Sequence, residues 1–197
     1  MLKKLEDWDQ SLFIYLNNLG LEQYDGFWIF VTQIETWTPL FAFFIFLFYR
    51  SYPWKAASAV FYFLLITTGI TLLATDIVKE TIERLRPNNV EALGELIRVL
   101  QRPSNFSFFS GHASSSFAIT TFTVLALRHY IKWIYLAFLW PLLFVTSRIY
   151  VGVHYPSDIL VGALVGSTFA YIFYKICKVE LARLNAIEVP PPSTNDE

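Results

Sequence analysis

Arg148, His154 and Asp158 lie within eleven positions of one another, in the stretch SRIYVGVHYPSD (residues 147–158) between two apolar runs. A carboxylate four residues after a histidine can accept a hydrogen bond from one ring nitrogen, which leaves the other nitrogen as a neutral nucleophile. Arginine suits phosphate because its planar guanidinium donates two hydrogen bonds at once. These three side chains therefore indicate phosphoryl-transfer chemistry.

Two more cations, Lys79 and Arg86, follow an earlier apolar run. Together with Arg148 they make three cations with no matching run of acids, which predicts an anion-binding site. Ionisable side chains beside long apolar runs are costly, so several of them together indicate a function.

Ser110, Gly111 and His112 open a third apolar run. The free N–H groups and the dipole of a helix N-terminus attract an anion, and glycine lets the backbone approach it closely. His112 would then face the leaving group as a general acid. The remaining histidine, His129, falls at the other end of its run and is interpreted as an interface anchor.

The elements that must position these residues are those of a membrane protein. Of 197 residues, 55% are hydrophobic and 16% are charged, with a mean hydropathy of +0.45. Soluble domains carry charge on about a quarter of their residues. The net charge is −1 and the sequence has no basic stripe, so nothing in its charge indicates nucleic-acid binding. Cys177 stands alone, so no internal disulfide is possible.

Five apolar runs are long enough for membrane helices, which need roughly 20 residues. Glu35 and Pro39 interrupt the first run and are expected to bend it. The predicted fold class is all-α, a polytopic transmembrane helix bundle of five to six membrane helices plus an N-terminal amphipathic helix at the interface. The runs cover residues 25–49, 56–78, 111–128, 131–150 and 157–177.

The chain is expected to divide into an N-terminal interfacial segment (1–24), a transmembrane domain (25–178) and a C-terminal tail (179–197) disordered at its end. The polar connection 79–110 is long for a hairpin, and its stretch EALGELIRVL is expected to form a short surface helix. Because successive runs alternate in direction, all the candidate site residues converge at one end of the bundle.

Three motifs, taken together, resemble the signatures of the type-2 phosphatidic acid phosphatase superfamily, in order and with its spacings, over residues 50–177. They are Lys79-x6-Arg86-Pro87, Ser110-Gly111-His112 and Ser147-Arg148-x5-His154-x3-Asp158. One position departs from the family, because Phe109 stands where the second signature has proline. That proline shapes the helix entry and donates nothing to phosphate, so the chemistry is expected to survive.

The resemblance implies that His154 attacks phosphorus and forms a phosphohistidine, while Asp158 orients its ring. His112 would protonate the departing oxygen, and water would then release phosphate. The implied enzyme is a metal-independent phosphoric ester or diphosphate hydrolase without a cofactor, and no further cluster of histidines and carboxylates suits a divalent metal. The implied ligands of the phosphoryl oxygens are Lys79, Arg86, Ser110, Gly111 and Arg148.

The implied substrate is a lipid, because the site lies at membrane depth and the chain carries no extra soluble domain. Undecaprenyl diphosphate, phosphatidylglycerophosphate and phosphatidic acid are candidates, and a lipid A phosphatase or phosphotransferase on the same site stays an open alternative. The haloperoxidases of this superfamily are soluble, which argues against them. A transporter, the non-enzymatic alternative, should carry its ionisable residues near the membrane midplane. The lipid and the bilayer are the expected partners, and no obligate protein partner is evident.

The charge distribution predicts an integral protein of the bacterial inner membrane with its active site facing outward. With the three candidate phosphate ligands set aside, the positive-inside rule compares seven cations on the opposite face with five on the site face. The seven are Arg50, Lys55, Arg128, Lys132, Lys175, Lys178 and Arg183, and the five are Lys3, Lys4, Arg84, Arg98 and Arg102.

Overall fold

The computed structural model describes residues 2–188, and every regular element in that range is a helix. The seven α-helices are α1 (Leu2–Asn18), α2 (Asp25–Val31), α3 (Thr38–Ser51), α4 (Trp54–Ile82), α5 (Gly111–Leu127), α6 (Leu139–Tyr150) and α7 (Pro156–Glu188). Short 3₁₀ segments cover Glu22–Tyr24, Ile34–Trp37, Pro87–Asn89, Glu91–Leu93 and Lys132–Phe138. The all-α prediction is confirmed for this part of the chain.

Length and hydropathy qualify three helical segments of the described chain as membrane spans: Trp54–Leu93, Lys132–Tyr150 and Pro156–Leu184. A fourth span results if the pair Glu22–Val31 and Ile34–Ser51, bent by 65°, is counted as one. A bend in the first apolar run is confirmed, and it lies at residues 32–33, just before Glu35 and Pro39. Because α5 has 17 residues, or about 25 Å at 1.5 Å per residue, it falls just short of these criteria. The predicted number of five to six membrane helices therefore stays a prediction.

The helix α5 is central to the bundle, where it contacts α3, α4, α6 and α7. Its contact with α7 is close because Gly162 and Gly166 form a GxxxG pattern, the small-residue spacing that lets helix backbones approach. A Cβ added to Gly162 would lie 2.7 Å from the backbone oxygen of Ser110. The α4 side of α5 is joined by a hydrogen bond of 2.9 Å between the hydroxyls of Thr75 and Ser114. These contacts hold the N-terminus of α5 beside that of α7.

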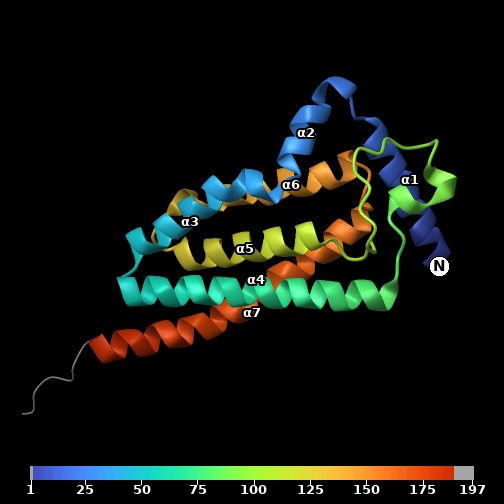
Figure 1. Ribbon diagram of the computed structural model, residues 1–197. Helices are drawn as coiled ribbons and strands as arrows, with labels where there is room; N and C mark the ends of the chain where they lie inside the picture. The colour runs from blue at the N-terminus through green and yellow to red at the C-terminus, as the bar shows by residue number, and fades with distance from the viewer. Residues whose placement is uncertain (1, 189–197) are drawn as a thin grey trace, which may run out of the picture.

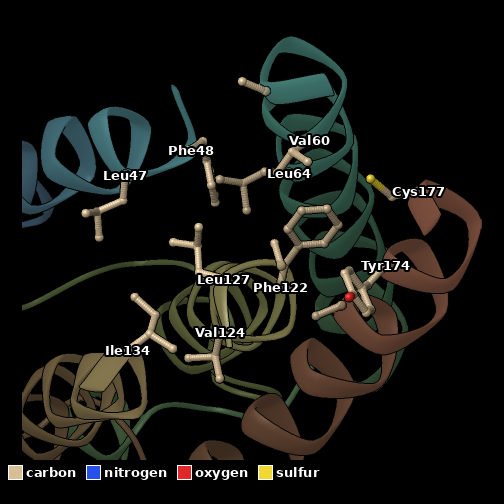
Figure 2. Close-up of a cluster of buried hydrophobic side chains, with 13 residues drawn as sticks. Leu47, Phe48, Val60, Leu64, Phe122, Val124, Leu127, Ile134, Tyr174 and Cys177 are labelled. Carbon is tan, nitrogen blue, oxygen red and sulfur yellow. The ribbon is translucent and has the colours of Figure 1, made fainter. Parts of the chain in front are cut away.

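The largest hydrophobic cluster lies at the end of the bundle opposite α1, where α3, α4, α5 and α7 meet (Figure 2). Phe48, Val60, Phe122 and Cys177 are fully buried there. Since lipid tails are as apolar as these side chains, the cluster stabilises the bundle by close packing more than by escape from water.

The helix α1 and the connection 83–110 lie together at the other end of the bundle (Figure 1). One face of α1, spaced by four residues, is buried and consists of Asp9, Phe13 and Asn17. Apolar side chains on its other faces are exposed, as an interfacial helix requires. They are Leu5, Trp8 and Tyr15. The sequence therefore anticipated the exposed side of this helix and not the buried one.

The surface helix predicted for EALGELIRVL is wrong, because this stretch forms one 3₁₀ turn at Glu91–Leu93 and then irregular chain. Tertiary hydrogen bonds replace the helical ones. The side-chain amide of Asn17 donates to the backbone oxygen of Arg98 at 3.0 Å and accepts from its N–H at 2.7 Å. Leu93 and Ile97 are buried against α1 instead of lying on the surface.

The helix α7 continues through the first residues of the predicted tail and ends at Glu188. The rest of that tail, residues 189–197, lies outside the described residues.

Candidate active site

The structure places the sequence-predicted residues at the end of the bundle that carries α1. Lys79 belongs to the last turn of α4, and Arg86 follows it in the connection to α5. Arg148 lies in the last turn of α6. All three cations are buried, with no more than 6% of each residue exposed. His129 lies at the opposite end of the bundle and lines a separate pocket there with Tyr52 and Lys178.

His154 and Asp158 form a fully buried pair at the start of α7. The Nδ1 atom of His154 lies 3.3 Å from Oδ2 of Asp158. The same oxygen accepts the backbone N–H of Tyr155 at 3.0 Å and the hydroxyl of Ser107. Because Asp158 is held by these other donors, its carboxylate can fix the orientation of the imidazole ring.

The contact of His154 with Arg86 determines which ring nitrogen carries the proton. Nη1 of Arg86 lies 2.9 Å from Nε2 of His154. A guanidinium can only donate, so Nε2 accepts and the proton resides on Nδ1, facing Asp158. Burial, and after it the charge of Arg86, holds the pKa of His154 well below its ordinary value. The ring is therefore neutral, with its Nε2 lone pair directed at a cation.

Arg86 is held in place by the backbone and side chains around it. Its Nε and Nη2 atoms donate to the backbone and side-chain oxygens of Asn105, both at 2.8 Å, and Nη1 donates to the backbone oxygen of Val153 at 3.1 Å. A guanidinium fixed by three acceptors loses little entropy when it binds an oxyanion.

Arg148 contacts the α2–α3 break and the 83–110 connection. Nη1 donates to the hydroxyl of Thr32 and, at 3.1 Å, to Oε1 of Gln101. Its Nε is buried and has no hydrogen-bond partner within the described part of the chain. A buried guanidinium N–H without a protein acceptor fits an anion site better than a structural ion pair.

The residues before α5 form its capped N-terminus. The Ser110 hydroxyl accepts from the backbone N–H of Ala113 at 3.3 Å, and the Ser110 N–H donates to the backbone oxygen of Asp158 at 3.0 Å. A Cβ on Gly111 would stand 3.8 Å from Nζ of Lys79, an ordinary contact distance. Protein packing alone therefore does not require glycine here, whereas a close ligand would.

His112 follows in the first turn of α5, where its ring centroid lies 5.1 Å from that of Phe144. Burial, and after it the charge of nearby Arg148, lowers the pKa of His112. The negative charge of a phosphate held by the three cations would offset this lowering, so the position suits a proton donor only when the substrate is bound.

Sequence reasoning missed Arg84 and Asp9 as parts of this site. Arg84 donates from Nη1 to Oδ1 of Asp158 and from Nη2 to Oδ2 of Asp9, both at 2.7 Å. Arg84 is two residues from Arg86, which is the available signal, but a charge in a polar connection also serves solubility. Asp9 is 75 residues from Arg84, and nothing near it in the sequence indicates the contact.

Across residues 2–188, no group of three or more histidine, cysteine, aspartate or glutamate side chains is arranged to hold a metal ion. The donors gathered here are cationic, which suits an oxyanion and repels a divalent cation. Metal independence itself stays a prediction.

Comparison with known proteins agrees with the motifs. The model of the PAP2 superfamily matches residues 59–180. The chain is 29% identical to a lipid A 4'-phosphatase of Bacteroides thetaiotaomicron over 98% of its own length and 86% of the relative's. It is 30% identical to an undecaprenyl-diphosphatase of Sulfolobus acidocaldarius over 84% of its length and 85% of the relative's.

Two crystal structures share the fold. A transmembrane PAP2-type phosphatidylglycerolphosphate phosphatase from Bacillus subtilis aligns with a TM-score of 0.72 at 20% identity, over 89% of this chain and 87% of that one. LpxE from Aquifex aeolicus aligns with a TM-score of 0.61 at 27% identity, over 84% and 94%. The resemblance seen in the sequence is thus confirmed: the chain belongs to the PAP2 superfamily of membrane lipid phosphatases.

Proposed function

We propose that this protein removes the terminal phosphate of a membrane lipid through a phosphohistidine formed on His154. The observation that carries the proposal is the contact of His154 Nε2 with Arg86 Nη1 at 2.9 Å, while Nδ1 faces Asp158. The lone pair of the nucleophile is thereby directed at a group that would hold a phosphoryl oxygen. A substrate phosphate would take over the guanidinium proton that His154 accepts here and bring phosphorus to Nε2.

In the first step, the Nε2 lone pair of His154 forms a bond to phosphorus, and the bond from phosphorus to the leaving oxygen breaks. His112 gives that oxygen a proton. Negative charge on the equatorial oxygens is stabilised by Lys79, Arg86 and Arg148, the step at which fixed cations contribute most. Asp158 stabilises the positive charge that develops on the imidazole ring.

In the second step, water attacks the phosphohistidine and passes a proton to His112. The bond from phosphorus to Nε2 breaks, inorganic phosphate leaves, and His154 recovers its lone pair. Each protonation state is then restored, so no metal or redox partner is needed to balance the cycle.

For the substrate, we propose a phosphorylated lipid of the lipid A type, with undecaprenyl diphosphate as the second candidate. Lipid A 4'-phosphatases of Bacteroides thetaiotaomicron and Porphyromonas gingivalis are 29% and 28% identical to the chain, over 98% and 85% of its length. The archaeal undecaprenyl-diphosphatase at 30% identity supports the second candidate. Both are long-chain lipids whose tails remain in the bilayer.

A substrate panel tests the proposed function. We expect release of phosphate from lipid A and undecaprenyl diphosphate in excess EDTA, with kcat/KM at least about a hundredfold above that for a short soluble phosphate ester. The tail concentrates the phosphate at the site and its binding energy orients the reacting group. Phosphatidic acid and phosphatidylglycerophosphate complete the panel.

Equal efficiency on the soluble ester would contradict a lipid phosphatase. Loss of activity in EDTA with recovery in magnesium would contradict the metal-independent cycle. A preference for undecaprenyl diphosphate over lipid A would reverse the order of the two candidates.

The proposed orientation, with the site on the outer face, is tested by thiol labelling. In a Cys177→Ser background, Glu95→Cys places a thiol in the exposed part of the 83–110 connection, and Lys132→Cys places one at the opposite end. We expect an impermeant thiol reagent to label the first in intact cells and the second only after lysis. The reverse pattern would place the active site on the cytoplasmic face.

A further inference from the structure

Asp9, on the N-terminal helix α1, is buried at the start of α7, with 4% of the residue exposed. Its Oδ1 accepts the backbone N–H of Ser157 at 2.9 Å, and Oδ2 accepts the Ser157 hydroxyl. Oδ2 also forms the 2.7 Å ion pair with Arg84. A carboxylate with three donors is a specific contact and more than the anchor that an interfacial helix needs.

Arg84 connects this carboxylate to the proposed catalytic pair. Its Nη1 donates to Oδ1 of Asp158 at 2.7 Å and to the Ser157 hydroxyl at 2.8 Å. Its guanidinium carbon lies 4.0 Å from the centroid of the Tyr155 ring, a cation–π distance. The guanidinium is therefore clamped between two carboxylates and an aromatic face.

The two oxygens of Asp158 have different partners. Oδ2 faces His154 and accepts from Ser107 and Tyr155, whereas Oδ1 bonds to Arg84. A carboxylate rotates as a unit, so the position of Arg84 sets the plane in which Oδ2 meets His154. The position of Arg84 depends in turn on Asp9, because Arg84 and Asp9 also line a pocket at the protein surface where the guanidinium could otherwise turn outward.

We propose that Asp9 is a positioning residue for phosphoryl transfer, acting through Arg84 on Asp158 and His154. The N-terminal helix α1 then belongs to the catalytic apparatus as well as to the membrane interface. The proposal rests on the proposed function of His154 as nucleophile.

A purely structural role for Asp9 would be to cap α7, because Ser157 lies in the first turn and its N–H needs an acceptor. The substitution Asp9→Asn separates the two roles. Asparagine caps helices about as well as aspartate and keeps an acceptor for Ser157, but it removes the negative charge that holds Arg84.

The control is Asp7→Asn, which removes the same charge from an exposed position of the same helix. In the full-length protein, we expect Asp9→Asn to lower kcat for the lipid substrate roughly tenfold or more, since small misplacements of reacting groups are costly. KM should stay close to that of Asp7→Asn, which should match the wild type, and all variants are assayed well below their melting temperatures because Asp9→Asn also removes a buried ion pair. Asp9→Glu, which keeps the charge, should recover part of the loss.

A double-mutant cycle makes the assignment to Arg84 specific. Arg84→Gln alone should lower kcat. Adding Asp9→Asn should lower it by no more than about a further twofold, because Asp9 acts on Asp158 only through Arg84, which is already absent. Full additivity of the two losses, or a kcat for Asp9→Asn equal to that of Asp7→Asn, would overturn the proposal.

Wild type and His154→Ala are assayed alongside. An inactive wild type or an active His154→Ala would contradict the proposed function. With those two behaving as expected, the Asp9 results test the positioning role alone.

Discussion

His154→Ala is expected to lose at least about a thousandfold in kcat, because the variant lacks the Nε2 atom that forms the covalent intermediate in the proposed cycle. The residual rate would come from the cations, which still bind and polarise the phosphate. Phosphate release from the preferred lipid measures the loss, and acid-labile labelling of the wild-type enzyme by radioactive substrate should disappear in the variant. Full activity in His154→Ala would contradict the nucleophile assignment.

His112→Ala is the companion variant, with an expected loss of about 10² to 10⁴ for a general acid. An aryl phosphate that carries an alkyl chain distinguishes the roles of the two histidines. Its leaving group is an acidic phenol, which can depart without receiving a proton. His112→Ala should still release a burst of phenol from this substrate, whereas His154→Ala should not. His129→Ala, at the far end of the bundle, is the matched control and should retain wild-type activity.

The sequence could predict those parts of the site that are local in the chain. His154 and Asp158 are four residues apart where α7 begins, and Ser110 to His112 open an apolar run, so their spacing alone indicates that each group lies together. The bend in the first apolar run was likewise a local prediction, and the break lies at residues 32–33, just before Glu35, while Pro39 occupies the first turn of α3. In each case the residues that determine the structure are neighbours in sequence.

Contacts between distant segments could not be predicted in this way. Asp9 reaches Arg84 across 75 residues, and Asn17 pairs with Arg98 across 81. The latter contact also explains the wrong helix in the 91–100 stretch, whose backbone is satisfied by α1 instead of by itself. Hydropathy likewise predicted the end of the fifth apolar run at residue 177, whereas the helix α7 ends at Glu188. A helix can continue beyond its apolar part, so the end of the run does not determine the end of the helix.

The position of α1 changes how the site should be understood. Its composition predicts only an amphipathic helix that lies at the membrane interface. In the structure its buried face supplies the acceptor for Arg84 and the amide that fixes the backbone near Arg98. Asp9 on α1 is therefore connected to Asp158 through Arg84 by two successive hydrogen bonds.

Arg86→Lys is expected to lower kcat/KM by about 10² to 10³, the loss typical of removing one fixed donor to a developing oxyanion. Lysine keeps the positive charge but has no planar fork. It cannot bond both oxygens of Asn105 and still present a donor at Nε2 of His154, as Arg86 does through separate nitrogens. The positive charge would remain in the site, but the fixed direction of the hydrogen-bond donors would be lost.

The measurement that isolates this effect is inhibition by vanadate, which adopts the five-coordinate geometry of phosphoryl transfer. If Arg86 acts mainly on the transition state, its substitution by lysine should weaken inhibition by vanadate in proportion to the fall in kcat/KM. Inhibition by inorganic phosphate should be weakened less. Arg102→Lys is the matched control, because Arg102 is exposed in the same connection. A value of kcat/KM for Arg86→Lys within about threefold of the control, where a lost transition-state donor predicts far more, would show that charge alone suffices at this position.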